Sequence, residues 1–135
     1  MTFASSQPDL HSSELTDRPS CRYMIQSINA ATVNVAGRQR MLSQRIAMFC
    51  CRLASTTAPT ERARLRATIQ TLGETMGRSH QGLLYGDVEL DLPGHLSAAV
   101  RSLYFDAPWQ VDAQVTAYLA AVAAFCQVPD HDITA

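Results

Sequence analysis

A chain of 135 residues, of which 47% are hydrophobic and 17% charged, is long enough to bury one core and has the composition of a single globular domain. Its formal net charge of -1 excludes a general electrostatic attraction to nucleic acid or to an acidic membrane surface. Four cysteines are too few and too irregularly spaced for a disulfide framework, so we expect them to be small buried side chains in a reducing compartment.

The N-terminal part of the chain shows neither apolar periodicity nor a secretory signal. Residues 1–19 are rich in Ser, Asp, Pro and Thr, which predicts a flexible N-terminal arm. No apolar run in the sequence is as long as a membrane span requires. We therefore expect a cytoplasmic protein if this is the full natural chain.

A long amphipathic helix is predicted from about residue 20, because apolar side chains recur there at alternating steps of three and four. It should be roughly 33 residues long and end at a Ser-Thr-Thr-Ala-Pro segment. Thr60 is the expected N-cap of the next helix. The apolar stripe of the first helix consists of Ile25, Ile28, Val35, Leu42, Ile46, Phe49 and Leu53.

Three further helices are predicted at about 61–85, 95–105 and 106–128, joined by short turn-rich links. No alternating run rich in Val, Ile and Thr predicts a strand. The expected fold is therefore all-α, an antiparallel four-helix bundle over residues 20–128, followed by a C-terminal tail at 129–135.

Single residues within these helices carry further expectations. Asp106 should cap the last helix at its N-terminus. Val100 and Leu103 should point inward from the short third helix. Gly73 and Gly77 destabilise the second helix, so we expect them to allow close packing against a neighbour.

The chemically informative stretch is 34–46, where a glycine and three arginines fall inside the first helix. Such a polar block is costly in a coiled-coil helix and calls for a functional reason. Four of its residues are related by three, four or seven steps and so share one flank beside the apolar stripe. These candidate ligand-binding residues are Gly37, Arg40, Met41 and Gln44. Two such helices across a two-fold axis would bring both Arg40 side chains together, and a planar oxyanion would bridge them by charge-assisted hydrogen bonds.

The run 34–45 has the pattern Asn-x-Ala-Gly-x-x-Arg-Met-x-Ser-x-Arg, which resembles the signature of the PilJ-type sensor domain. That domain is named for the N-terminal region of type IV pilus methyl-accepting transducers, and it is similar to the sensor domain of nitrate/nitrite sensor histidine kinases. The resemblance continues through Leu-Leu-Tyr-Gly at 83–86, Leu-Pro at 92–93 and Trp109, so it covers most of residues 25–125.

The resemblance implies a bundle that dimerises through its first helix and holds one small anion, such as nitrate or nitrite, between the two subunits. Arg40 of each chain would be the main ligand, and Gly37 would allow the backbone to approach the anion. Asn34 and Arg45 match motif positions for which a structural role is the alternative to binding. The bound anion would then change the contact of the dimer with a separate signalling protein. If the chain is an excised fragment, the resemblance implies a periplasmic sensor domain.

Another class of function stays open beside the anion sensor. The chain could be a helical dimerisation or protein-interaction module with no small-molecule ligand, in which the arginines contact an acidic partner surface. An enzyme is not expected, because the sequence has no P-loop, dinucleotide fingerprint or nucleophile elbow, and no Glu-x-x-His pair for a metal bundle. We therefore predict no catalytic residue, no metal and no cofactor.

Several residues have ordinary structural interpretations. His80 lies near a predicted helix end and is expected at the surface or in a cap. The recurring Met24, Met41, Met48 and Met76 are expected to pack in the core. Three arginines seven residues apart should form a solvated face that pairs with carboxylates across the bundle. They are Arg38, Arg45 and Arg52.

Overall fold

The computed structural model describes residues 19–133, with side chains from residue 30 onward. This part of the chain contains four α-helices and one 3-10 turn, and within it no strand occurs beyond an isolated bridge between Asp87 and Leu92. The all-α class is thus confirmed for the described residues. The arm predicted over 1–19 lies outside them except for Pro19, where the first helix begins. The elements are α2 (Pro19–Ser55), α3 (Pro59–Tyr85), α4 (Ala98–Phe105), α5 (Val111–Gln127) and η1 (Asp130–Asp132).

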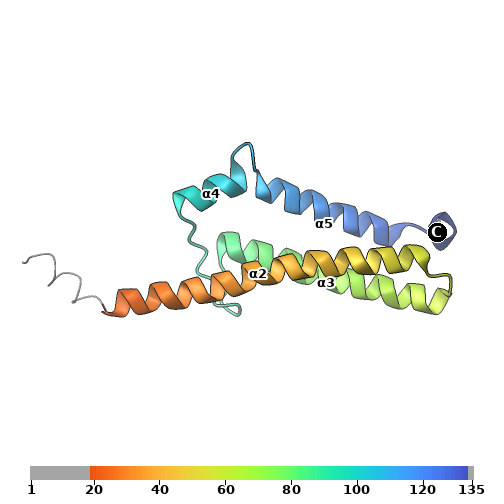
Figure 1. The fold of residues 1–135 in the computed structure, drawn as a ribbon, viewed down its shortest axis with the longest axis horizontal. Coiled ribbons are helices and arrows are strands. Elements are labelled where there is room, and N and C mark those ends of the chain that lie inside the picture. Colours follow the sequence, from red (N-terminus) through yellow and green to blue (C-terminus); the bar gives the residue numbers. More distant parts are fainter. Residues whose placement is uncertain (1–18, 134–135) are drawn as a thin grey trace, which may run out of the picture.

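Helices α2 and α3 form an antiparallel hairpin that contains most of the core (Figure 1). The predicted apolar stripe of α2 is buried wherever its side chains are described, apart from half-buried Phe49. The largest fully buried side chains of the core are Ile46 and Leu53 from α2 and Ile69 from α3. Gln39 fills a gap in the stripe and donates a hydrogen bond from Nε2 to the Met76 carbonyl at 3.0 Å. The side chains of Met24, Ile25 and Ile28 lie outside the described part.

The link between these helices ends two residues earlier than predicted. α3 begins at Pro59 behind the N-cap residue Ala58, so the prediction of Thr60 as N-cap is wrong. Proline has no N–H to leave unsatisfied and a backbone angle already suited to a helix, so it is favoured in the first turn.

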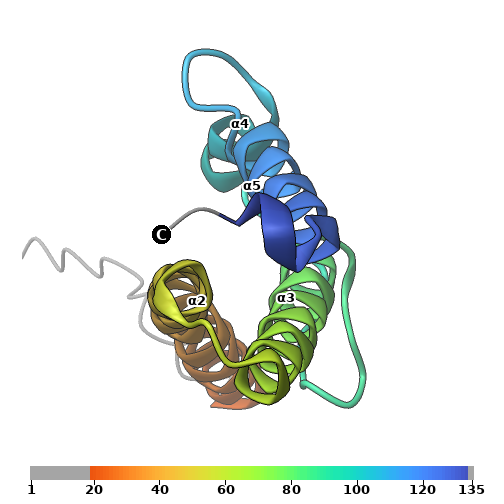
Figure 2. The ribbon, with the colours of Figure 1, turned by 90° about the vertical axis from the view of Figure 1, so that its right-hand side faces the viewer.

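Helix α3 lies between α2 and α5 as the central helix (Figure 2). α5 runs antiparallel to α3, and the short α4 packs mainly against α5 and away from α2. The prediction that Val100 and Leu103 point inward is therefore wrong, since both are exposed and no residue of α4 is buried. Asp106 does not cap α5 but ends α4, because its N–H bonds the Ser102 carbonyl.

The connector between α3 and α4 is held by a carboxylate. Asp87 accepts hydrogen bonds from the backbone N–H groups of Glu89 and Leu90 and from the guanidinium of Arg78. The hydrogen bond from Arg78 is the main reason why the pKa of Asp87 lies below its usual value. This turn places Leu92 in a second, smaller core cluster with Val35 and Leu83.

The predicted close packing at the α3 glycines is not found. A methyl group on Gly73 would meet the nearest side-chain atom, Val122 Cγ1, at 4.0 Å, and one on Gly77 would meet Leu119 Cδ1 at 3.5 Å. Both distances are ordinary van der Waals contacts. An alanine would therefore fit at either position.

Candidate functional site

Most of the predicted ligand-binding residues lie on one exposed face of α2. This face lies opposite the buried stripe, not beside it as the spacing alone suggested. Its members repeat at the same steps of three and four as the stripe, but they are offset from it by about half a turn around the helix. All of them are exposed. We call this face the α2 seam; it consists of Asn34, Gly37, Met41, Gln44, Met48, Cys51 and Ser55.

The seam combines polar residues with two large exposed hydrophobic side chains. Met41 is 48% exposed and Met48 is 50% exposed, so the prediction that both pack in the core is wrong, whereas Met76 is buried as predicted. Cys51 is exposed too, although all cysteines were expected to be buried. The heptad spacing of these residues is the pattern by which a helix packs against a second helix.

Gly37 is the second residue of the seam. Among the residues that the structure describes, no atom outside its own helix lies within 4 Å of the position that a Cβ would occupy. A glycine at such a point lowers helix stability without relieving any contact within the chain. What it does provide is an exposed stretch of backbone that another molecule can approach closely.

Two predicted arginine ligands flank the seam. Arg40 and Arg45 are exposed, and within residues 30–133 neither has a carboxylate oxygen within 4.0 Å of its guanidinium. The same holds for Arg38. Arg52 is the member of the predicted ion-paired face that does have a partner, Glu61, at 3.9 Å. The seam is thus bordered by positive charges that this part of the chain does not neutralise.

A buried histidine was missed by the sequence analysis. His80 is 3% exposed, so the expectation of a surface or capping role is wrong. Its Nε2 lies 2.7 Å from Oδ1 of Asp112, which joins α3 to the first turn of α5. The ring of Tyr104 from α4 lies 5.9 Å away between centroids. The signal available in the sequence was the position of His80, which follows Met76 by four residues and precedes Leu83 by three, so that all three share one face of the helix.

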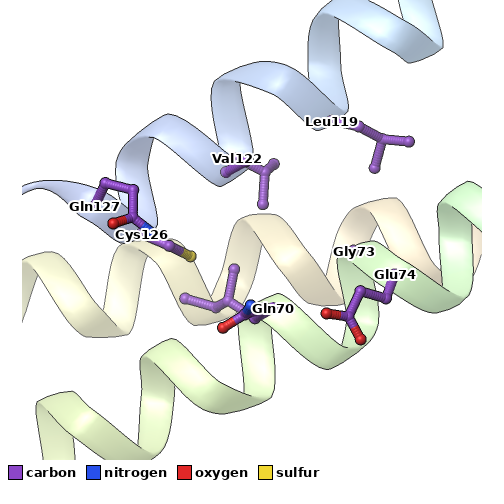
Figure 3. Close-up of a pocket in the computed structure, with 9 residues that line it drawn as sticks. Gln70, Gly73, Glu74, Leu119, Val122, Cys126 and Gln127 are labelled. Atoms are coloured by element: carbon purple, nitrogen blue, oxygen red, sulfur yellow. The ribbon is translucent and has the colours of Figure 1, made fainter.

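A pocket of about 270 Å³ lies between α3 and α5, separate from the α2 seam. Figure 3 shows Val122, Leu119 and Cys126 entering it from α5, with Gln70 and Glu74 at its border on α3. The lining is apolar and offers few polar groups to orient a ligand, so this pocket lacks the usual character of a specific site.

The described residues show no further site of a recognisable kind. Within them, no three His, Cys, Asp or Glu side chains come together as metal ligands. None of the helices in this part of the chain is long and apolar enough to cross a bilayer.

Comparison with known proteins gives one match. The PilJ family model, described as type IV pili methyl-accepting chemotaxis transducer N-term, matches residues 25–123. No curated protein and no solved structure matches the chain. The matched span includes all of the α2 seam and its flanking arginines, together with α3, α4 and most of α5. The family resemblance of the 34–45 motif is therefore confirmed, and the chain belongs to the PilJ family of transducer sensory domains.

Proposed function

We propose that this chain is a homodimeric sensor domain that binds a small oxyanion of the nitrate or nitrite type between the α2 helices of two copies. The observation that carries the proposal is the exposed α2 seam, with its methionines, its open glycine and its unneutralised flanking arginines. Membership of a family of transducer sensory domains supports a role in signalling. In this proposal the helices of each copy form the antiparallel four-helix bundle, and α2 forms the interface.

In this proposal the two α2 helices pair in parallel, an arrangement with which the seam spacing is compatible. Met41 and Met48 take one type of core heptad position, and Gly37, Gln44 and Cys51 take the other. A two-fold axis parallel to the helices would then place each seam residue level with its own copy. Exposed methionines are well suited to such a surface, because their flexible side chains fill an interface of irregular shape.

The heptad register also gives the flanking arginines defined neighbours across the interface. Arg40 precedes the core position of Met41, and Arg45 follows that of Gln44. In a parallel pair these flanking positions lie at the edge of the interface, and Arg40 of each copy would extend over the open Gly37 position toward Arg40 of the other. Both members are cations, so each contact is repulsive when it is empty.

A planar oxyanion would relieve this repulsion. Guanidinium groups bind such anions through charge-assisted and often bidentate hydrogen bonds, and Arg40 from each copy would supply them. The anion would then favour the arrangement in which the arginines converge. Any shift of the helices depends on this difference in affinity between the two arrangements, and it would alter contacts with a separate signalling protein.

Titration calorimetry with nitrate, nitrite and chloride tests the proposal, with sedimentation equilibrium to establish the oligomeric state. We expect saturable binding of nitrate or nitrite at one anion per dimer. Arg40→Ala should weaken this binding by about 100-fold or more, because each charge-assisted bond contributes roughly 1.5–3 kcal/mol and each dimer loses two arginines. Arg40→Lys keeps the charge but not the planar fork, and it should restore only part of the affinity.

Arg64→Ala is the matched control, since this exposed arginine lies on α3 and pairs with Glu61 at 3.8 Å. It should leave anion binding unchanged. A dimer that releases no heat with any anion would contradict the sensor proposal and favour a helical interaction module without a small-molecule ligand. A loss of affinity in Arg64→Ala equal to that in Arg40→Ala would show a general charge effect instead of a site on α2.

A further inference from the structure

The pocket between α3 and α5 is an apolar space beside a helix that is only lightly buried. Among residues 111–127 of α5, Val122 is the single one that is buried. The volume of the pocket, about 270 Å³, is close to the lower end of the range typical of small-molecule sites. An apolar cavity of roughly 150 Å³ is already large enough to hold a benzene molecule. The α3–α5 pocket therefore has room for one ring or a short alkyl chain.

Gly73 lies on the α3 side of this pocket. A glycine inside a helix lowers helix stability, and close packing does not account for this one, because an added Cβ would lie 4.0 Å from the nearest side-chain atom, Val122 Cγ1. The missing side chain instead leaves space free between the two helices. A ligand in that space would account for a glycine at this position.

The interior of the pocket is formed mainly by apolar side chains. Ile69 is fully buried, Val122 is 9% exposed and Leu119 is half-buried. Figure 3 shows Val122 and Cys126 directed from α5 toward α3. Burial is the main reason why the pKa of Cys126 is raised, so its thiol is uncharged at neutral pH. Such an interior suits the apolar part of a ligand and does not select for a polar group.

One carboxylate lies at the border of the pocket. Glu74 is exposed on α3, and within residues 30–133 no arginine or histidine nitrogen lies within 4.0 Å of its carboxylate oxygens. Arg78 follows one turn later on the same helix, but its guanidinium binds Asp87 and Glu89. The pocket lining itself contains no basic residue. Its border therefore carries a negative charge without a direct partner in the described part of the chain, and such a charge attracts a cation.

We propose that the α3–α5 pocket binds a small amphipathic cation, with its apolar body between the helices and its ammonium group at Glu74. Transfer of the apolar body out of water supplies most of the affinity, because the interior is lined by apolar side chains. The carboxylate adds orientation and a modest preference for positive charge, since ion pairs at an exposed site contribute little. All of these residues belong to one chain, so binding depends neither on the α2 seam nor on the proposed anion site.

Titration calorimetry with three small probes of similar shape tests the charge preference. The probes are 2-phenylethylamine, its neutral counterpart 2-phenylethanol and the anion phenylacetate. We expect saturable binding of the amine at one molecule per chain, about three- to fivefold tighter than that of the alcohol. Phenylacetate should bind most weakly, because its charge repels that of Glu74.

Glu74→Gln keeps the shape of the side chain and removes its charge, so the amine should bind this variant no more tightly than the alcohol does. The affinity for the alcohol should stay unchanged. Glu89→Gln is the matched control, since it removes an exposed carboxylate from the connector between α3 and α4, outside the pocket lining. It should leave the preference for the amine as it is in the unaltered chain.

Alkylation by iodoacetamide locates the bound probe, because the Cys126 thiol lines the pocket. The amine at about ten times its dissociation constant should slow alkylation of Cys126 by about tenfold and leave that of exposed Cys51 unchanged. Gly73→Leu places a large side chain in the pocket and should weaken binding of the amine by about tenfold or more. Thr75→Leu adds a similar side chain on the exposed face of α3, outside the pocket lining, and should not change binding.

Two calorimetric results would overturn the proposal. They are the absence of saturable heat with the amine, and equal affinities for amine and alcohol in the unaltered chain. Equal protection of Cys51 and Cys126 would also overturn it, because the amine would then bind the surface without preference for the pocket. Glu74→Gln changes an exposed side chain, so its result does not depend on whether Gly73→Leu folds.

Discussion

Gly37→Ala distinguishes an α2 seam that faces solvent from one that packs against a second copy. Within the described part of a single chain the added methyl group meets nothing within 4 Å, so it creates no strain there. Replacing glycine by alanine in a helix interior stabilises the helix by about 0.8–1.0 kcal/mol. In a chain of this size that gain should raise the melting temperature of the monomer by roughly 3–5 °C.

The effect on the dimer should have the opposite sign. If the two α2 helices pair in parallel register, Gly37 meets its own copy at the interface and both methyl groups enter it. Overpacking of a close contact typically costs about 1–3 kcal/mol, so the dimer dissociation constant should rise by roughly fivefold to more than a hundredfold. The same substitution would thus stabilise the chain and weaken its association.

Gly73→Ala is the control that isolates the helix effect. Gly73 also lies within a helix, and its added methyl group would lie 4.0 Å from Val122 Cγ1, in ordinary contact and on a different helix from the seam. It should stabilise the monomer by a similar amount and leave the dimer dissociation constant unchanged.

Urea unfolding at a concentration below the dissociation constant measures the monomer, and sedimentation equilibrium over a concentration series measures association. Gly37→Ala that stabilises the monomer like Gly73→Ala and also leaves association unaffected would refute a close α2 contact at this position. A destabilised Gly37→Ala monomer would refute the argument from free space itself. Either result would remove the principal support for a dimer formed through the seam.

Two further predictions concern the supports around the site. Asp112→Ala leaves His80 buried without its carboxylate partner, so the free energy of unfolding, measured in urea, should fall by about 1–3 kcal/mol. A fall of less than about 0.5 kcal/mol, which is typical of a surface substitution, would show that the contact is unimportant. The pKa of Asp87 is lowered, chiefly by its hydrogen bond with Arg78, so its contribution to stability is present above its unfolded pKa and lost as the pH falls through the folded pKa. Below about pH 4 the melting temperature should therefore fall less steeply with decreasing pH in Asp87→Asn than in the unaltered chain. Equal slopes of melting temperature against pH would contradict this assignment.

Sequence periodicity was sufficient to place the long helices and their buried faces. The stripe of α2 from Val35 to Leu53 was predicted, because a long helix must repeat its apolar residues at the helical period to bury one face. The motif at 34–45 was also sufficient for the family, since it is a local pattern of residue types.

The sequence could not decide which surfaces remain uncovered. Met41 and Met48 have apolar side chains of a kind that is common in protein cores. Only the position of α3 on the other side of α2 shows that they face outward. Val100 and Leu103 were misplaced for the same reason, because α4 packs on α5 and not into the hairpin. Among the ligand candidates, residue identities came from the motif, but their common exposed face became apparent only from the packing.

Contacts between distant parts of the chain depended wholly on tertiary structure. His80 meets Asp112 across 32 positions of sequence, and Arg62 meets Asp130 across 68. Neither pair has a local spacing that would reveal it. Helix formation is governed by neighbouring residues, so the sequence by itself determined the helices and the family motif. Burial of a polar group requires a hydrogen-bond partner from elsewhere in the chain, so only the folded structure decided that His80 is buried and that Arg62 binds Asp130. The packing of α3 against one side of α2 likewise decided which face of α2 stays open.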